Sequence, residues 1–167
     1  DEYYTLLVSA VSGMMLMAHA NNLLVLFVGI ELMSISFYVM AGFLRTNIRS
    51  VEAALKYFLL GAFATGFLVY GMSLVYGATG SLQYDVIAGV VASNSTPFPA
   101  LLAIGGVLLA VALSFKVAAF PFHQWAPDVY EGSPTVVTAF MSTAGKAAAF
   151  SAFIAVFAVM MPSSSTL

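Results

Sequence analysis

Long apolar runs occupy most of this chain, and they constrain its fold more than any other feature of the sequence. A helix that spans the hydrocarbon core of a bilayer needs about 20 mostly apolar residues. Hydrophobic residues make up 62% of the 167 residues and charged residues only 7%, whereas a soluble domain carries about a quarter of charged residues. The sequence therefore predicts an all-α polytopic membrane protein with about five to six transmembrane helices and no soluble domain.

The predicted helices form a single transmembrane domain over residues 1–167. Helices are expected at residues 4–18, 22–44, 51–78, 100–119 and 134–161, with a short helical piece at 121–131. Residues 79–99 are rich in Gly, Ser, Asn and Pro and are interpreted as a polar linker. Pro121 follows closely after Lys116 and should break that helix, because proline cannot donate a backbone hydrogen bond. The chain starts without methionine and ends abruptly, so we expect it to be part of a longer subunit.

Charge and composition restrict the orientation and the class of partner. Arg45 and Arg49 lie in one short loop, and the positive-inside rule places loop 45–50 in the cytoplasm of a multi-pass protein. We expect the inner (plasma) membrane of a bacterium. The net charge of −2 and the lack of a basic patch argue against a nucleic-acid partner. The sequence has no cysteine for thiolate metal or iron–sulfur sites and no Gly-rich phosphate loop for ATP.

Three charged residues lie inside apolar runs, where ionised side chains are costly and are functional candidates by default. Glu31 lies roughly 13 Å into its helix, and Lys146 lies roughly 18 Å past the helix start at Pro134. Lys116 precedes the proline break, and discontinuous helices of this kind build ion sites in transporters. Two of them have a structural alternative: a hydrogen-bonded protonated carboxyl for Glu31, and snorkelling to the headgroups for Lys116. The small residues around Lys146 permit close helix packing and leave room for water.

Two further residues are candidates for proton relay. Lys56 lies four residues after Glu52 on the same helix face, so it could act in transport or form a helix-end ion pair. His123 could carry protons near neutral pH or could be hydrogen-bonded and structural. His19 lies at a helix end and carries little functional signal.

Three segments together resemble one known family. They are Gly-Ile-Glu-Leu-Met-Ser-Ile-Ser-Phe-Tyr at 29–38, Glu-Ala-Ala-Leu-Lys-Tyr at 52–57, and Phe-Lys-Val-Ala-Ala-Phe-Pro-Phe-His-Gln-Trp-Ala-Pro-Asp-Val-Tyr-Glu-Gly-Ser-Pro-Thr at 115–135. A fourth, Ser-Thr-Ala-Gly-Lys at 142–146, follows in the same order. The chain resembles the antiporter-like membrane subunits of respiratory complex I (NADH:quinone oxidoreductase), most closely the N type, called subunit 2 in mitochondria.

The resemblance implies a proton-translocating subunit with one repeat of a larger helical fold. Glu31 matches the family's modulating carboxylate, Lys116 its broken-helix lysine, Lys146 its central-axis lysine, and Lys56 an additional lysine of the N type. Protons would move through these buried groups, driven by quinone reduction elsewhere in the complex as the Glu31–Lys116 pair opens or tightens.

The resemblance to the complex I subunits further implies that this chain carries no cofactor and no redox centre. Other membrane-arm subunits would be its neighbours in the bilayer, and partners in the complex would carry FMN and iron–sulfur clusters, with quinone as substrate. The alternatives are a subunit of a multisubunit Na⁺/H⁺ antiporter and a structural scaffold that retains the charges.

Overall fold

The computed structural model describes residues 1–160, with side chains described for residues 1–158, and most of this part of the chain is helical. An isolated bridge between Asn22 and Gln83 is the sole strand-like pairing within it. The elements in order are α1 (Glu2–Ala18), α2 (Leu23–Ala41), α3 (Ile48–Thr79), α4 (Tyr84–Ser93), α5 (Pro99–Val117), α6 (Trp125–Gly132), α7 (Thr135–Phe140), the π-helix η1 (Met141–Gly145) and α8 (Lys146–Met160).

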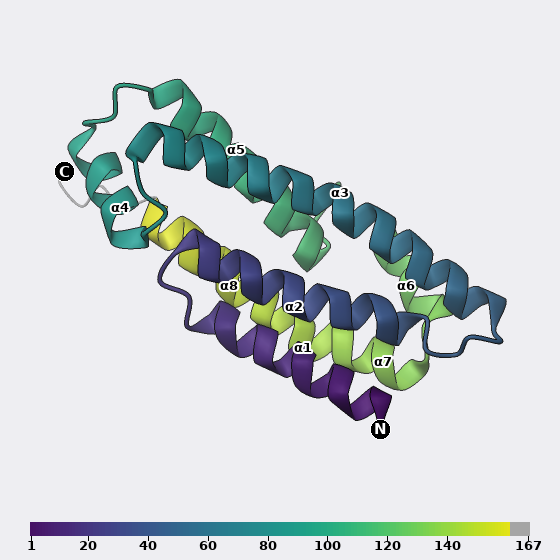
Figure 1. Cartoon of the computed structure of the whole chain (residues 1–167). Helices are drawn as coiled ribbons and strands as arrows, with labels where there is room; N and C mark the ends of the chain where they lie inside the picture. Colours follow the sequence, from purple (N-terminus) through teal and green to yellow (C-terminus); the bar gives the residue numbers. More distant parts are fainter. Residues whose placement is uncertain (161–167) are drawn as a thin grey trace.

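The long helices run side by side in an elongated bundle (Figure 1). α3 packs along α5, and α1 packs along α2, while α8 contacts both α1 and α5. α7, η1 and α8 follow one another without a break, because Met141 and Lys146 keep right-handed helical backbone angles. The short helix α6 packs against α3 and α7 at the end of the bundle where α3 begins.

Local sequence signals explain where the two central helices begin and end. The Asn22 side chain accepts a hydrogen bond of 2.8 Å from the Val25 amide and caps α2. Asn47 does the same for α3, at 3.0 Å from the Arg49 amide. Gly80 ends α3 with a φ of 72°, a left-handed conformation that glycine adopts without steric cost.

Paired glycines allow the helices to approach closely. A Cβ atom at Gly13 of α1 would lie 2.7 Å from the carbonyl oxygen of Gly29 of α2. Gly71 of α3 and Gly105 of α5 form a second pair, with a Cβ on either meeting the other's carbonyl oxygen at 3.0 Å. Small residues at helix crossings are the usual means of packing helices within a membrane.

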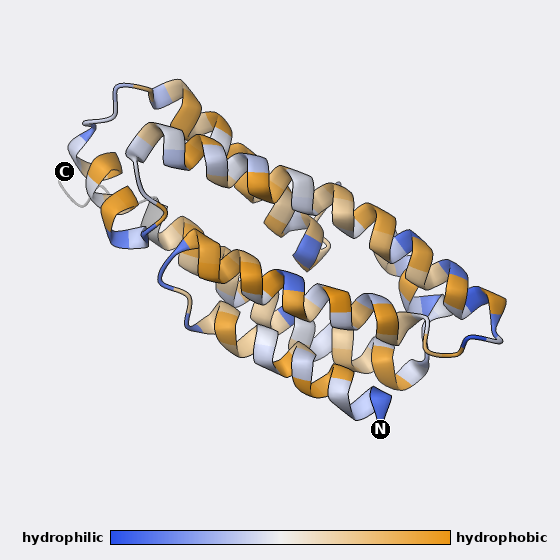
Figure 2. Cartoon of the chain, viewed as in Figure 1, coloured by the Kyte–Doolittle hydropathy of each residue, from blue (hydrophilic) through white to orange (hydrophobic). Residues whose placement is uncertain are grey.

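The prediction of an all-α polytopic membrane protein is confirmed. Within the described residues, four helices are long and apolar enough to cross a bilayer: α2, α3, α5 and the continuous helix over Thr135–Ala158. α1 is also apolar and has 17 residues. Figure 2 shows apolar residues along these helices, with hydrophilic residues concentrated near the loops and helix ends.

The observed bounds differ from the sequence prediction in one element and in details of length. The segment 79–99, interpreted as a linker, contains the helix α4, which is a correction to that interpretation. α4 starts at Tyr84, whose buried side chain anchors it to the bundle, and ends at Asn94 in the left-handed conformation. The predicted helices at 22–44 and 51–78 are observed at Leu23–Ala41 and Ile48–Thr79. Residue 161, the predicted end of the last helix, lies outside the described residues.

Candidate functional site: two lysines at a helix break

The discontinuous helix predicted from Pro121 is present. α5 ends at Val117, Ala118 adopts a left-handed conformation with a φ of 58°, and α6 begins at Trp125. The backbone groups freed by the break find partners within the protein. The Ser114 carbonyl accepts a bond of 2.9 Å from the Ala119 amide. Such irregular backbone is tolerated at membrane depth only where protein or a wet cavity surrounds it.

Lys116 lies in the last turn of α5 and is 8% exposed. Its ammonium group donates a hydrogen bond of 2.8 Å to the Ser34 hydroxyl of α2 and a longer one of 3.5 Å to the Tyr38 hydroxyl. The ammonium also lies 5.9 Å from the centre of the Tyr38 ring. Because the group points into the bundle against α2, snorkelling to the headgroups does not describe its position.

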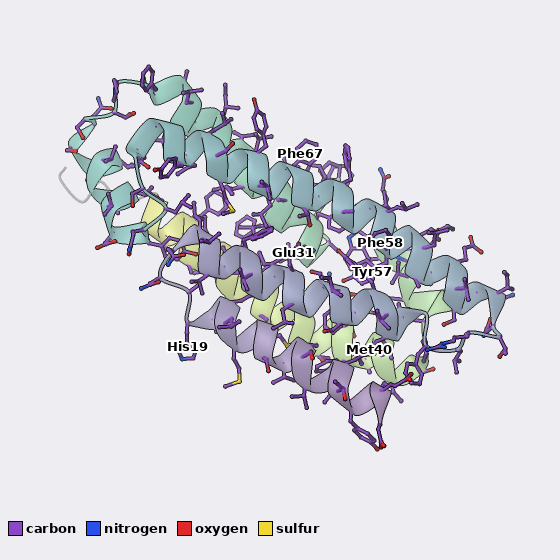
Figure 3. The ribbon with its side chains drawn as sticks, in the orientation of Figure 1. His19, Glu31, Met40, Tyr57, Phe58 and Phe67 are labelled. Carbon is purple, nitrogen blue, oxygen red and sulfur yellow. The ribbon has the colours of Figure 1, made fainter. Side chains whose placement is uncertain are left out.

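Glu31 lies one turn before Ser34 on α2 and is partly buried. Its carboxylate accepts a hydrogen bond of 2.8 Å from the Thr65 hydroxyl of α3, and Figure 3 shows Glu31 on the side of α2 that faces α3. No ion pair joins Glu31 to Lys116 among the residues with described side chains. In this conformation the Glu31 carboxylate and the Lys116 ammonium are therefore held by separate hydroxyl partners, Thr65 of α3 and Ser34 of α2.

Lys146 is the second lysine at the break, and it follows directly on the π-helix η1. Its ammonium donates a hydrogen bond of 3.1 Å to the backbone carbonyl of Lys116. It also lies 4.6 Å from the centre of the Trp125 ring and 6.0 Å from that of Tyr130. The carboxyl end of a helix carries partial negative charge, so the end of α5 is an electrostatically favourable position for the Lys146 ammonium. π-helical segments are frequent at functional sites.

Lys56 lies outside this group, on the outer side of α3, with 43% of its side chain exposed. Its ammonium pairs with Glu52 at 2.8 Å, as the four-residue spacing predicted, and with Asp128 of α6 at 2.7 Å. Arg49 and Glu131 form a looser pair at 3.9 Å beside it. These residues line a charged hollow of about 270 Å³ and tie α6 to the start of α3.

The two histidines are not part of the lysine group. His123 is exposed in the turn between α5 and α6, with its ring 5.6 Å from that of Phe120. His19 is exposed at the end of α1, where its Nδ1 lies 3.1 Å from the Met15 carbonyl oxygen (Figure 3). No group of three metal-ligating side chains occurs in the part of the chain with described side chains.

Several residues of the site were not anticipated from the sequence. Ser34 and Tyr38 follow Glu31 by three and seven residues, so their helical spacing could have indicated that they share its face. Thr65 and Trp125 carried no such local signal, because their roles depend on contacts between helices.

Gly61 of α3 makes room for the Tyr38 hydroxyl, because a Cβ atom there would collide with that oxygen. The Tyr38 ring is buried and packs edge-on against Tyr57 at 4.8 Å, so it has little freedom to move aside. We expect Gly61→Ala to displace the hydroxyl from Lys116 and to lower proton-coupled turnover roughly fivefold, the value of about one hydrogen bond. The matched control is Gly77→Ala on the same helix, where nothing lies within 4 Å of the new Cβ. Equal turnover in the two variants would contradict a role for the Tyr38 contact.

Comparison with known proteins identifies the family. Residues 20–167 match the family described as the transmembrane part of NADH:quinone oxidoreductase and Mrp antiporters. The chain belongs to this family. The NADH-quinone oxidoreductase subunit N 1 of Chloroherpeton thalassium is 59% identical over 155 residues, which cover 93% of this chain and 32% of that relative. The resemblance to the N-type antiporter-like subunits is thereby confirmed.

Solved structures of the NADH:quinone oxidoreductase/Mrp family share the fold. A chain of respiratory complex I from Thermus thermophilus with bound aureothin superposes with a TM-score of 0.80 at 46% identity, covering 92% of this chain and 34% of that chain. A chain of the Mrp complex from Dietzia sp. DQ12-45-1b gives a TM-score of 0.80 at 26% identity, covering 93% and 29%. The present chain thus spans about a third of the length of its family members.

Proposed function

We propose that this chain forms part of a proton-translocating membrane-arm subunit of an NADH:quinone oxidoreductase. The observation that carries the proposal is the buried Lys116 ammonium, held by hydroxyls at the break of α5 while Lys146 binds the carbonyl of the same residue. A charged group is costly within a bilayer and is retained there mainly for transport or charge compensation. The identity to subunit N relatives supports the same assignment.

The proposed chemistry is proton transfer governed by electrostatics. Lys116 exchanges its hydroxyl partners on α2 for the carboxylate of Glu31 as the bundle changes conformation. Opposite charges at 4 Å attract by about 4 kcal/mol at an effective dielectric of 20, so making and breaking this pair moves a proton on or off Lys116. Lys146 is the next carrier, because its ammonium already touches the Lys116 backbone.

Lys56 and His123 have lesser parts in this proposal. Lys56 is held by two carboxylates on the outer side of the bundle, and His123 lies exposed in the turn after α5. Because His123 is exposed and the Lys56 side chain is 43% exposed, they would exchange protons with water rather than with Lys116 and Lys146. Loop 45–50 would face the cytoplasm of a bacterium, with the whole chain forming a single transmembrane domain in the inner membrane.

The proposed partners are the other membrane-arm subunits, together with redox subunits that carry FMN and iron–sulfur clusters and reduce quinone. Affinity purification of the full-length protein from mild-detergent membranes tests this assembly. We expect NADH:quinone activity to copurify, with flavin and iron–sulfur absorbance. A purified complex of membrane subunits without any redox centre would contradict the proposal and favour the Na⁺/H⁺ antiporter alternative, since the present chain also shares its fold with a chain of the Mrp complex.

A further inference from the structure

Trp125 is the only tryptophan of the chain and the first residue of α6, directly after the helix break. It is 3% exposed. Its side chain contacts the residue before Lys116 and the Lys146 ammonium. The apolar character of this position does not by itself require an aromatic side chain. The role of the indole is therefore inferred from its contacts.

The indole N–H fixes the end of α5. It donates a hydrogen bond of 3.0 Å to the carbonyl of Phe115, the residue before Lys116. That carbonyl belongs to the last turn of the helix, where the intrahelical donors run out. The bond therefore ties the start of α6 to the turn that carries Lys116, across the helix break.

The face of the same indole receives the second lysine. The Lys146 ammonium lies 4.6 Å from the ring centre, within the range of a cation–π contact, which is strongest for tryptophan. Tyr57 of α3 stacks on the indole at 4.7 Å with an angle of 8° between the rings. The stacking of Tyr57 thus fixes the orientation of the indole. The backbone carbonyl of Lys116 accepts a hydrogen bond from the same Lys146 ammonium at 3.1 Å.

We infer that Trp125 is a positioning residue that holds the Lys146 ammonium against the carboxyl end of α5. The inference rests on the proposed function, because it assigns Trp125 a role in the transfer between Lys116 and Lys146. Because the indole is bonded to the Phe115 carbonyl and contacts the Lys146 ammonium, a displacement of α6 would be transmitted to both lysines. Trp125 itself carries no proton in this account.

The test compares two replacements of similar size in the full-length protein within its complex. Trp125→Leu removes the ring face and the N–H, whereas Trp125→Phe keeps a weaker aromatic face. Proton uptake driven by NADH in sealed vesicles is measured per assembled complex. We expect Trp125→Leu to lower it about tenfold and Trp125→Phe about threefold, as loss and weakening of a buried cation–π contact predict. Phe120→Leu is the control, because Phe120 is 85% exposed in the same turn.

A double-mutant cycle with Lys146→Met separates positioning from packing. If Trp125 acts through Lys146, neither replacement lowers the residual uptake of Lys146→Met further. A further loss of proton uptake in the Lys146→Met background would overturn the inference, as would equal effects of Trp125→Leu and Trp125→Phe. If the Trp125→Leu variant fails to assemble, the cycle is decided with Trp125→Phe alone. Full uptake in Lys116→Met and Lys146→Met would instead overturn the proposed function.

Discussion

Replacing Lys116 by methionine is expected to lower NADH:quinone turnover coupled to proton movement by roughly a hundredfold, a loss typical for removal of a proton-transfer group. Methionine fills nearly the same volume without an ammonium group, so the apolar packing at the end of α5 is kept. The Ser34 hydroxyl retains its own bond of 2.6 Å to the Ile30 carbonyl and is not left without a partner. The measurement is turnover in membranes, normalised to the amount of assembled complex.

The control for this variant is His19→Gln. His19 is exposed at the end of α1, with its nearest polar contact to its own helix, and its loss should leave turnover within about twofold, since surface substitutions away from special features have small effects. Lys116→Arg is informative as well, because a guanidinium keeps the charge but cannot release its proton. Coupled turnover at the wild-type level in Lys116→Met or Lys116→Arg would contradict proton transfer through Lys116.

Gly13→Ala is expected to destabilise the protein by about 2 kcal/mol, as overpacking of a close contact does. The new Cβ would lie 2.6 Å from the Met33 amide nitrogen and 2.7 Å from the Gly29 carbonyl oxygen. Both are backbone atoms of α2 that cannot rotate away, so α1 must move off α2. The measurement is the thermal unfolding midpoint of the detergent-solubilised full-length protein.

Gly66→Ala is the matched control, because it makes the same chemical change in a helix with nothing within 4 Å of the new Cβ. Alanine is a better helix former than glycine by about 1 kcal/mol, so this variant should be equal to or more stable than wild type. The expected result is a lower unfolding midpoint for Gly13→Ala and an unchanged or higher one for Gly66→Ala. A loss of stability of the same size in both would contradict the close α1–α2 packing.

The fold class could be predicted from the sequence because the bilayer imposes long apolar helices, and the break after Lys116 because Pro121 cannot continue one. α4 was missed because it is short and bounded by polar residues, and its helical state depends on burying Tyr84 and Ile87 against the bundle. The π-helix before Lys146 was also missed, because Met141–Gly145 differs from an α-helix only in its hydrogen-bond register.

The charged residues of the candidate site could be predicted from the sequence, but the residues that contact them could not. Lys116 and Lys146 were recognisable as candidates because charge is costly in an apolar run, and the structure buries Lys116 and partly buries Lys146. Their contacts depend on how each helix is rotated about its axis, which the sequence does not state. Small side chains around Lys146 suggested space for water, yet the structure places the Trp125 ring against its ammonium. Likewise, the expected Glu31–Lys116 pair is replaced in this conformation by bonds to Thr65 and Ser34.

The most direct test of proton transfer through the two lysines is the number of protons translocated per NADH oxidised, measured in sealed vesicles for wild type, Lys116→Met and Lys146→Met. Residual electron transfer is compared with residual proton uptake in the same preparation. Proton carriage through these lysines predicts that the ratio falls in both variants, while the Phe120→Leu control keeps the wild-type ratio. An unchanged ratio in both lysine variants would contradict the claim and would make these residues structural.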